Sequence, residues 1–89
     1  MTTLYLAHVG FYDQEIGIYE LHSNILVVAE DIKSAREAIK QKEIYQSKNM
    51  HIDGMIEIST VDGYNVILEK QKCDSLNRAF GYAEVKTLG

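Results

Sequence analysis

The sequence predicts an α+β fold, with a mixed and mostly antiparallel sheet of four to five strands and one main helix on one face. Three observations support this class. Short apolar runs alternate as strands do, residues 32–46 are dominated by strong helix formers, and Asp62-Gly63 separates two strand-like runs. The predicted order is β-β-α-β-β, with a further strand near the C-terminus. At 89 residues, the chain is expected to form a single domain, residues 1–89.

The first half of the chain predicts two strands. Residues 3–9 carry apolar residues at both odd and even positions, so both faces of this strand should be buried. Gly10 opens a polar stretch, which favours a loop. Residues 16–20 alternate only weakly. A turn is expected at 22–24, and then a β-branched strand at 25–29, in the middle of the sheet.

The helix is the most clearly marked element. Asp31 is a suitable N-cap, and Asn49 is suited to the left-handed residue that ends a helix. Within residues 32–46 the apolar positions form one narrow stripe, which should cover one sheet face: Ile32, Ala35, Ala38, Ile39 and Tyr45.

The Asp62-Gly63 hairpin allows two registers. A two-residue loop would pair Val61 with Tyr64 and mix polar with apolar residues on both sides. A three-residue loop with a left-handed Gly63 pairs Thr60 with Tyr64 and gathers the apolar residues on one side. We therefore predict the second register, with structural roles for Asp62, Gly63 and Tyr64.

The remaining segments complete the predicted sheet. A right-handed crossover through the helix would make the strand near 55–60 parallel to the strand at 25–29. Residues 71–79 are predicted to form a loop or a short helix, and residues 82–86 alternate like a closing edge strand.

This layout leaves one sheet face without a cover. Two strands are apolar on both faces, whereas one helix covers only one face. A second copy of so short a chain would complete the burial. We therefore predict a homo-oligomer, most simply a homodimer.

Charge and composition restrict the partners. Nine Lys and Arg oppose thirteen Asp and Glu, for a net charge of −4, which argues against nucleic acid. Lys33, Arg36 and Lys40 share one helix face, which favours a solvated surface. Apolar runs are far shorter than the roughly 20 residues of a membrane helix, and we expect no secretory signal. One cysteine, Cys73, forms no internal disulfide, as expected of a cytoplasmic protein.

Three short strings suggest a family. They are Glu20-Leu21-His22, His51-Ile52-Asp53 and Val61-Asp62-Gly63-Tyr64. Their order, with the helix between the first two, resembles the bacterial family called domain of unknown function 1543, over about residues 3–70. The resemblance implies a fold family but no activity, substrate or cofactor. Some members resemble tandem copies of the unit, which is consistent with pairing of single-copy chains.

Two of these strings carry candidate chemistry. His51 and Asp53 are two residues apart, as are Glu20 and His22, so in extended segments each pair points to one side. If the pairs were adjacent, their imidazoles and carboxylates could bind zinc, manganese or iron, or act as an acid-base pair. Both strings also lie beside predicted turns, where such side chains commonly cap backbone groups. His8, within a strand, is expected to be a hydrogen-bonded core or edge histidine.

The sequence therefore favours a small cytoplasmic protein that acts through binding or self-assembly, without catalysis. The alternative is a small metal-assisted or acid-base enzyme that uses His22, His51 and Asp53, with Glu20, at a subunit boundary. The enzyme requires these groups within hydrogen-bond reach of one another in a concave site. Side chains that lie apart and cap turns would favour the non-catalytic module.

Overall fold

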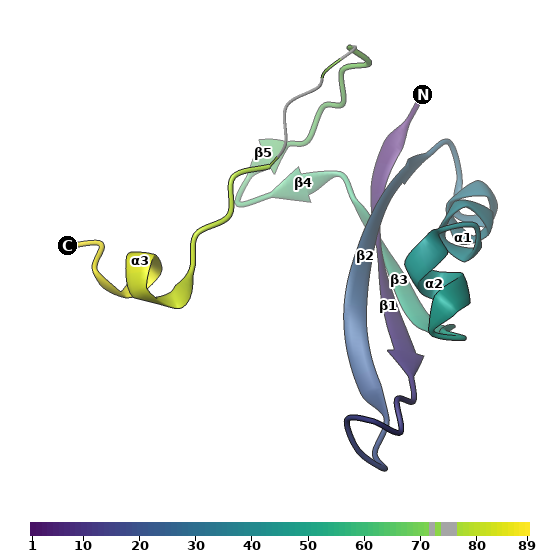
Figure 1. The fold of residues 1–89 in the computed structure, drawn as a ribbon. Helices are drawn as coiled ribbons and strands as arrows, with labels where there is room; N and C mark the ends of the chain where they lie inside the picture. The colour runs from purple at the N-terminus through teal and green to yellow at the C-terminus, as the bar shows by residue number, and fades with distance from the viewer. Residues whose placement is uncertain (72, 74–76) are drawn as a thin grey trace.

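The structure, a computed structural model, describes residues 1–71, 73 and 77–89 and confirms the α+β class. Three strands form one sheet in the order β2-β1-β3 (Figure 1). They are β1 (Thr3–Phe11), β2 (Leu21–Ala29) and β3 (His51–Ile58). Helices α1 (Ile32–Lys40) and α2 (Glu43–Ser47) lie together on one side of this sheet.

The central position of β1 decides the strand directions. Both β2 and β3 pair antiparallel with β1, so they run in the same direction on either side of it. The predicted parallel relation between the second and third strands therefore exists across β1, while every pairing found in the described residues is antiparallel.

The first two strands are longer than predicted. Phe11 still pairs with Leu21, so residues 22–24 lie inside β2. The turn expected there was wrong. Residues 16–20, which alternate only weakly, form no strand. There the Asp13 carbonyl accepts hydrogen bonds from the backbone N–H groups of Ile16 and Gly17, both at 3.0 Å. These local bonds make a turn in place of a ladder.

The predicted single helix over 32–46 is divided in two. Asp31 caps α1 as predicted, and its side chain accepts the Ser34 backbone N–H at 2.7 Å, a bond that lowers the pKa of Asp31. Lys42 is extended, with ψ 139°, and interrupts the helix. Asn49 has φ 50°, which confirms the predicted left-handed end and turns the chain directly into β3.

The core lies between this helical layer and one sheet face. Its buried members come from β1, α1 and the residue just before β3: Ala7, Val9, Ile39 and Met50. Ala35 is also buried, whereas Ile32, at the start of the predicted stripe, is 53% exposed. The buried stripe of α1 therefore begins at Ala35 and reaches Ile39, so it is shorter than predicted.

The other sheet face is open in the single chain. Leu26, Val28 and Ile56 are about half exposed there, at 54%, 49% and 57%, and Leu6 is partly buried. The prediction that both faces of the first strand are buried is therefore wrong for one chain. The helical layer lies entirely on the opposite side (Figure 1).

The predicted hairpin register was wrong. Strands β4 (Thr60–Val61) and β5 (Tyr64–Asn65) form a separate two-stranded sheet, in which Val61 pairs with Tyr64. Asp62 and Gly63 have φ values of 52° and 82°, as in the two-residue type I′ turn. All four strand residues are exposed. Without a buried face, side-chain patterning does not decide the register, and the turn decides it.

The C-terminal segment extends away from the sheet (Figure 1). The predicted edge strand at 82–86 was wrong, because this segment is helix α3 (Tyr82–Lys86). A strand needs a partner, whereas one helical turn satisfies its backbone locally. The predicted loop or short helix at 71–79 includes residues 72 and 74–76, which lie outside the described residues. The radius of gyration, 15.8 Å, exceeds the roughly 12 Å of a compact chain of this length. In the part of the chain that the structure describes, no helix has the length and hydrophobicity to cross a membrane.

Candidate metal centre

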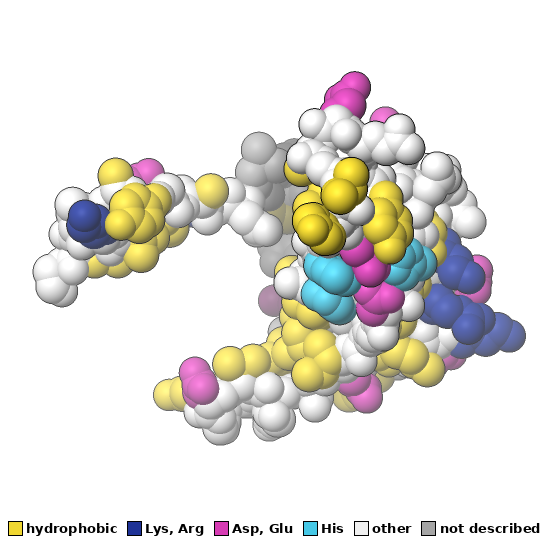
Figure 2. Space-filling view, turned by 90° about the horizontal axis from the view of Figure 1, so that it is seen from below, with side chains coloured by type: hydrophobic (Ala, Val, Ile, Leu, Met, Phe, Trp, Pro, Cys, Tyr) yellow, Lys and Arg dark blue, Asp and Glu magenta, His cyan; other side chains and the backbone are white. Residues whose placement is uncertain are grey.

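The candidate site lies at one end of the open sheet face, over Gly10. Gly10 is opposite His22 on one side and opposite His51 on the other. Both histidines therefore stand on strands that flank a residue without a side chain. Figure 2 shows the histidine and acidic side chains gathered in one patch, bordered by hydrophobic side chains.

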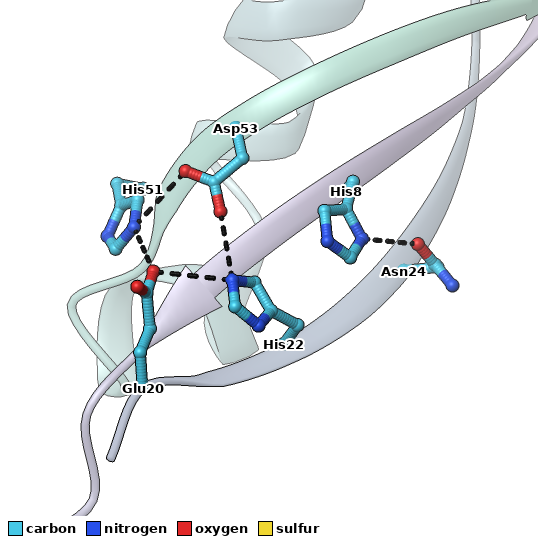
Figure 3. A network of polar contacts seen from close by, with 6 residues as sticks. All are labelled: His8, Glu20, His22, Asn24, His51 and Asp53. Atoms are coloured by element: carbon cyan, nitrogen blue, oxygen red, sulfur yellow. Dashed lines mark hydrogen bonds and ion pairs between the residues drawn. The ribbon is translucent and has the colours of Figure 1, made fainter.

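A β-bulge brings Asp53 into this patch. The register shifts so that His8 pairs with Gly54 and Val9 pairs with Ile52, which leaves Asp53 as an extra residue in β3. Ile52 and Met55 both pack on the core, so Asp53 and Gly54 lie together on the open side. Bulges commonly redirect a side chain at functional sites, and here the bulge turns the Asp53 carboxylate toward the two histidines (Figure 3).

Four side chains meet at this point. The Nε2 atom of His51 is 2.7 Å from Oε1 of Glu20 and 3.3 Å from Oδ1 of Asp53. The Nε2 atom of His22 is 3.4 Å from Oε1 of Glu20 and 3.3 Å from Oδ2 of Asp53. Figure 3 shows these four contacts as a closed ring of alternating imidazoles and carboxylates.

The absence of a side chain at Gly10 is required for this geometry. A Cβ atom there would lie 2.2 Å from Oε1 of Glu20, 2.6 Å from Nε2 of His51 and 2.9 Å from Oδ2 of Asp53. All three distances are shorter than real Cβ contacts. Gly10 is thus the floor of the site.

The loop before β2 is tied to the helical layer and ends at Glu20. The Asp13 carboxylate accepts a hydrogen bond from Lys48 Nζ at 3.1 Å and another from the Glu15 backbone N–H at 3.0 Å. Both bonds lower the pKa of Asp13, and the bond from Lys48 has the larger effect. The anchor restrains the loop that positions Glu20.

The donor set and its spacing suit a transition metal. A tetrahedral zinc ion with bonds of about 2.0 to 2.1 Å holds its ligand atoms about 3.3 Å apart. Three of the four imidazole–carboxylate separations are 3.3 or 3.4 Å, but they involve both oxygens of Asp53. The fourth, 2.7 Å between His51 and Glu20, is a hydrogen bond that an ion would replace. The ligand atoms that lie mutually within 4.8 Å are those of Glu20, His51 and Asp53, whereas His22 forms such a group with His8 and Asp53. The four side chains are 31% to 49% exposed, so solvent reaches the site.

The structure thus brings together all four residues singled out in the sequence. Each imidazole lies within 3.4 Å of both carboxylates, so these side chains contact one another rather than standing apart at turns. The other residues singled out, Asp62, Gly63 and Tyr64, form the hairpin turn. Tyr64 is 76% exposed, so it does not pack on the hairpin as expected.

Sequence reasoning missed three residues at the site. Gly10 was interpreted as the start of a loop, although it lies in β1. His8 is hydrogen-bonded as expected, through Asn24, but it is exposed on the open face beside His22, with the rings stacked 5.0 Å apart. Asn24 was assigned to a turn. His8 and Gly10 are two residues apart, and this spacing could have placed them on one face had the strand been extended past Val9.

A family model described as a domain of unknown function, DUF1543, matches residues 17–68, more than half of the chain. The chain belongs to this family. The DUF1543 match confirms the resemblance seen in the sequence, and its residues include Glu20, His22, His51 and Asp53, whereas His8 and Gly10 precede it. No curated protein and no solved structure matches this DUF1543 chain. The family description carries no activity, so function must be argued from the site.

Proposed function

We propose that this protein is a binding module for a divalent transition metal ion, held by Glu20, His22, His51 and Asp53. One observation carries the proposal. Two imidazoles and two carboxylates from β3 and the start of β2 meet over a glycine, with each imidazole nitrogen 2.7 to 3.4 Å from an oxygen of both carboxylates. These ligand atoms are crowded above Gly10, where no side chain fills the space. Such crowding is expected of a cation site rather than of ordinary surface salt bridges.

The ligand types favour zinc among the common ions. Calcium and magnesium prefer sites made entirely of oxygen atoms, whereas imidazole nitrogen suits zinc, copper, iron and nickel. Histidine nitrogen and carboxylate oxygen are both ligands that zinc binds in proteins. Manganese and iron accept the same ligands with lower affinity.

Zinc is expected to stabilise the protein against heat. At a zinc concentration of about 100 times Kd, binding adds about 2.7 kcal/mol to the free energy of unfolding, which raises Tm by about 10 °C or more. The measurement is thermal unfolding with and without zinc chloride at pH 7.5. Asp53→Asn should lose most of this shift, because the substitution removes a charged ligand. At pH 5.5 the shift should shrink, because an imidazole binds metal only after losing its proton.

Glu57→Gln is the matched control for Asp53→Asn. Glu57 is another exposed carboxylate of β3, outside the cluster, so this variant should keep the full zinc shift. An unchanged Tm of the wild-type protein at a large zinc excess would refute the proposal. An equal shift in wild-type and Asp53→Asn protein would place the bound zinc elsewhere.

We also propose that the open sheet face pairs with a second copy of the chain. Its apolar strip is formed by Leu4, Leu6, Leu26, Val28, Ile56 and Ile58, and it carries no charge that would select a charged partner. The strip residues are register partners across the three strands, so they form one continuous apolar area that can pack face to face with an identical one. A domain this small gains much from such burial. The metal centre would then lie at the rim of the interface.

A cytoplasmic location agrees with the single cysteine, Cys73.

The wild-type protein is therefore expected to be a dimer at a chain concentration of roughly 10 to 100 μM, which exceeds a micromolar Kd. Leu26→Lys should shift it to the monomer, because a charge would enter the centre of the apolar strip. Sedimentation velocity measures both states. Ile44→Lys is the control, since Ile44 is equally exposed, at 53%, but belongs to α2 on the opposite layer. A monomeric wild-type protein would rule out this pairing.

A further inference from the structure

We infer that the cluster binds two metal ions, bridged by the carboxylate of Asp53, with His8 as a ligand of the second ion. This inference rests on the proposed metal-binding function and extends it to a fifth residue. It rests on four features of the structure: two ligand groups, the orientation of Asp53, the hydrogen bond of His8 and the stacking of two histidines.

The ligand atoms form two groups of three. Glu20, His51 and Asp53 form one group, and His8, His22 and Asp53 form the other. Within each group the ligand atoms all lie within 4.8 Å of one another. Asp53 is the single residue common to both groups, so the two groups describe neighbouring sites that share one carboxylate.

The two oxygens of Asp53 face different histidines. Its Oδ1 is 3.3 Å from Nε2 of His51, and its Oδ2 is 3.3 Å from Nε2 of His22. Figure 3 shows the carboxylate standing between the two imidazoles, with one oxygen toward each. A carboxylate in this position can bind one ion through each oxygen and hold the ions about 3.5 to 4 Å apart, as in other two-metal centres.

A hydrogen bond prepares His8 for metal binding. Its Nδ1 is 3.0 Å from Oδ1 of Asn24. An amide oxygen only accepts, so Nδ1 carries the proton and Nε2 keeps a lone pair. Metal-binding histidines are usually oriented by such a bond from their other ring nitrogen. In Figure 3 the free ring nitrogen of His8 is turned toward Asp53 and His22.

Stacking holds the two histidines of the second site parallel. The ring centroids of His8 and His22 are 5.0 Å apart, and the planes differ by 7°. With one ion at Glu20, His51 and Asp53, His22 would keep its contacts with the two carboxylates. With two ions present, His22 serves the second ion together with His8.

Two ions would leave coordination positions open. Each ion then has three protein ligands, as in catalytic zinc sites where water takes the fourth position. Water bound in this way is the reactive group that a metal-assisted hydrolytic enzyme requires. A second ion would therefore supply the chemistry of the enzyme alternative, which a fully ligated single ion would not.

The test is the number of ions bound per chain. Full-length protein is dialysed against excess manganese chloride and, separately, zinc chloride, and bound metal is measured by elemental analysis. We expect two ions per chain for the wild-type protein and one for His8→Gln. Two adjacent manganese ions should also give an exchange-coupled electron paramagnetic resonance spectrum, which His8→Gln should convert to that of isolated manganese.

Two further variants sharpen the result. Asn24→Ala should lower the affinity for the second ion about 10- to 100-fold, because Asn24 orients His8. The affinity for the first ion should not change. Glu57→Gln should still bind two ions. One ion in both wild-type and His8→Gln protein would overturn this inference and leave the proposed function intact, whereas no bound ion would overturn both. Two ions in His8→Gln would exclude His8 as the ligand.

Discussion

Gly10→Ala is expected to abolish metal binding while the protein stays folded. The new Cβ atom would occupy the space between Glu20, His51 and Asp53, with separations of 2.2 to 2.9 Å, and would push these ligand atoms apart. The atoms that it meets are the ends of side chains, so they can move while the backbone stays in place. Alanine is also more favourable than glycine within a strand, by about 0.5 to 1 kcal/mol.

The measurement compares Tm with and without zinc chloride. At about a thousandfold excess over Kd, wild-type protein should gain about 4 kcal/mol from zinc, and Gly10→Ala should gain almost nothing. Gly54→Ala is the matched control, because Gly54 lies on β3 opposite His8 and a Cβ there meets no atom within 4 Å. If Gly10→Ala kept the full zinc stabilisation, the metal would not lie over Gly10.

Ile39→Ala is expected to cause the largest loss of stability among single core substitutions. Ile39 is fully buried in α1 and packs with Ala7, Val9 and Met50. Truncating a buried isoleucine to alanine costs about 2 to 5 kcal/mol, and the better helix propensity of alanine offsets only about 0.5 kcal/mol. The free energy of unfolding of a small domain is about 5 to 15 kcal/mol in total, so much of the stability would be lost.

Urea unfolding followed by circular dichroism measures this loss. The control is Ile44→Ala, the same substitution in α2 at a position that is 53% exposed, where we expect a change of about 0.5 kcal/mol or less. Similar losses at the two positions would mean that the helices do not pack on the sheet as described. Because the metal centre lies on the opposite sheet face, zinc should still stabilise Ile39→Ala protein where it remains folded.

The two predictions separate the requirements of the site from those of the core. Gly10 belongs to β1, whose alternate residues Ala7 and Val9 support the core while Gly10 and His8 face the open side. One strand therefore serves both purposes through its alternation. This arrangement explains why a substitution at Gly10 should affect binding, whereas one at Ile39 should affect folding.

Local signals were read correctly where they act within a few residues. Asp31 caps α1 through the Ser34 backbone N–H, and Asn49 ends the helical segment with a positive φ. Asp62-Gly63 forms a hairpin turn as expected, although with the shorter loop. The errors were made where a distant partner decides the outcome. Residues 22–24 resemble a turn but continue β2 because they pair with β1, and residues 82–86 alternate like a strand but form the helix α3.

The sequence by itself determined the α+β class, the family and the four residues at the proposed metal centre. These depend on residue type, on hydrophobic period and on spacings of two within a strand, all of which are visible along the chain. Only the tertiary structure decided that β1 lies between β2 and β3, that a bulge turns Asp53 toward the histidines, and that Gly10 and His8 belong to the site. The physical reason is that strand order and register come from backbone pairing between residues far apart in the chain, which no local pattern encodes.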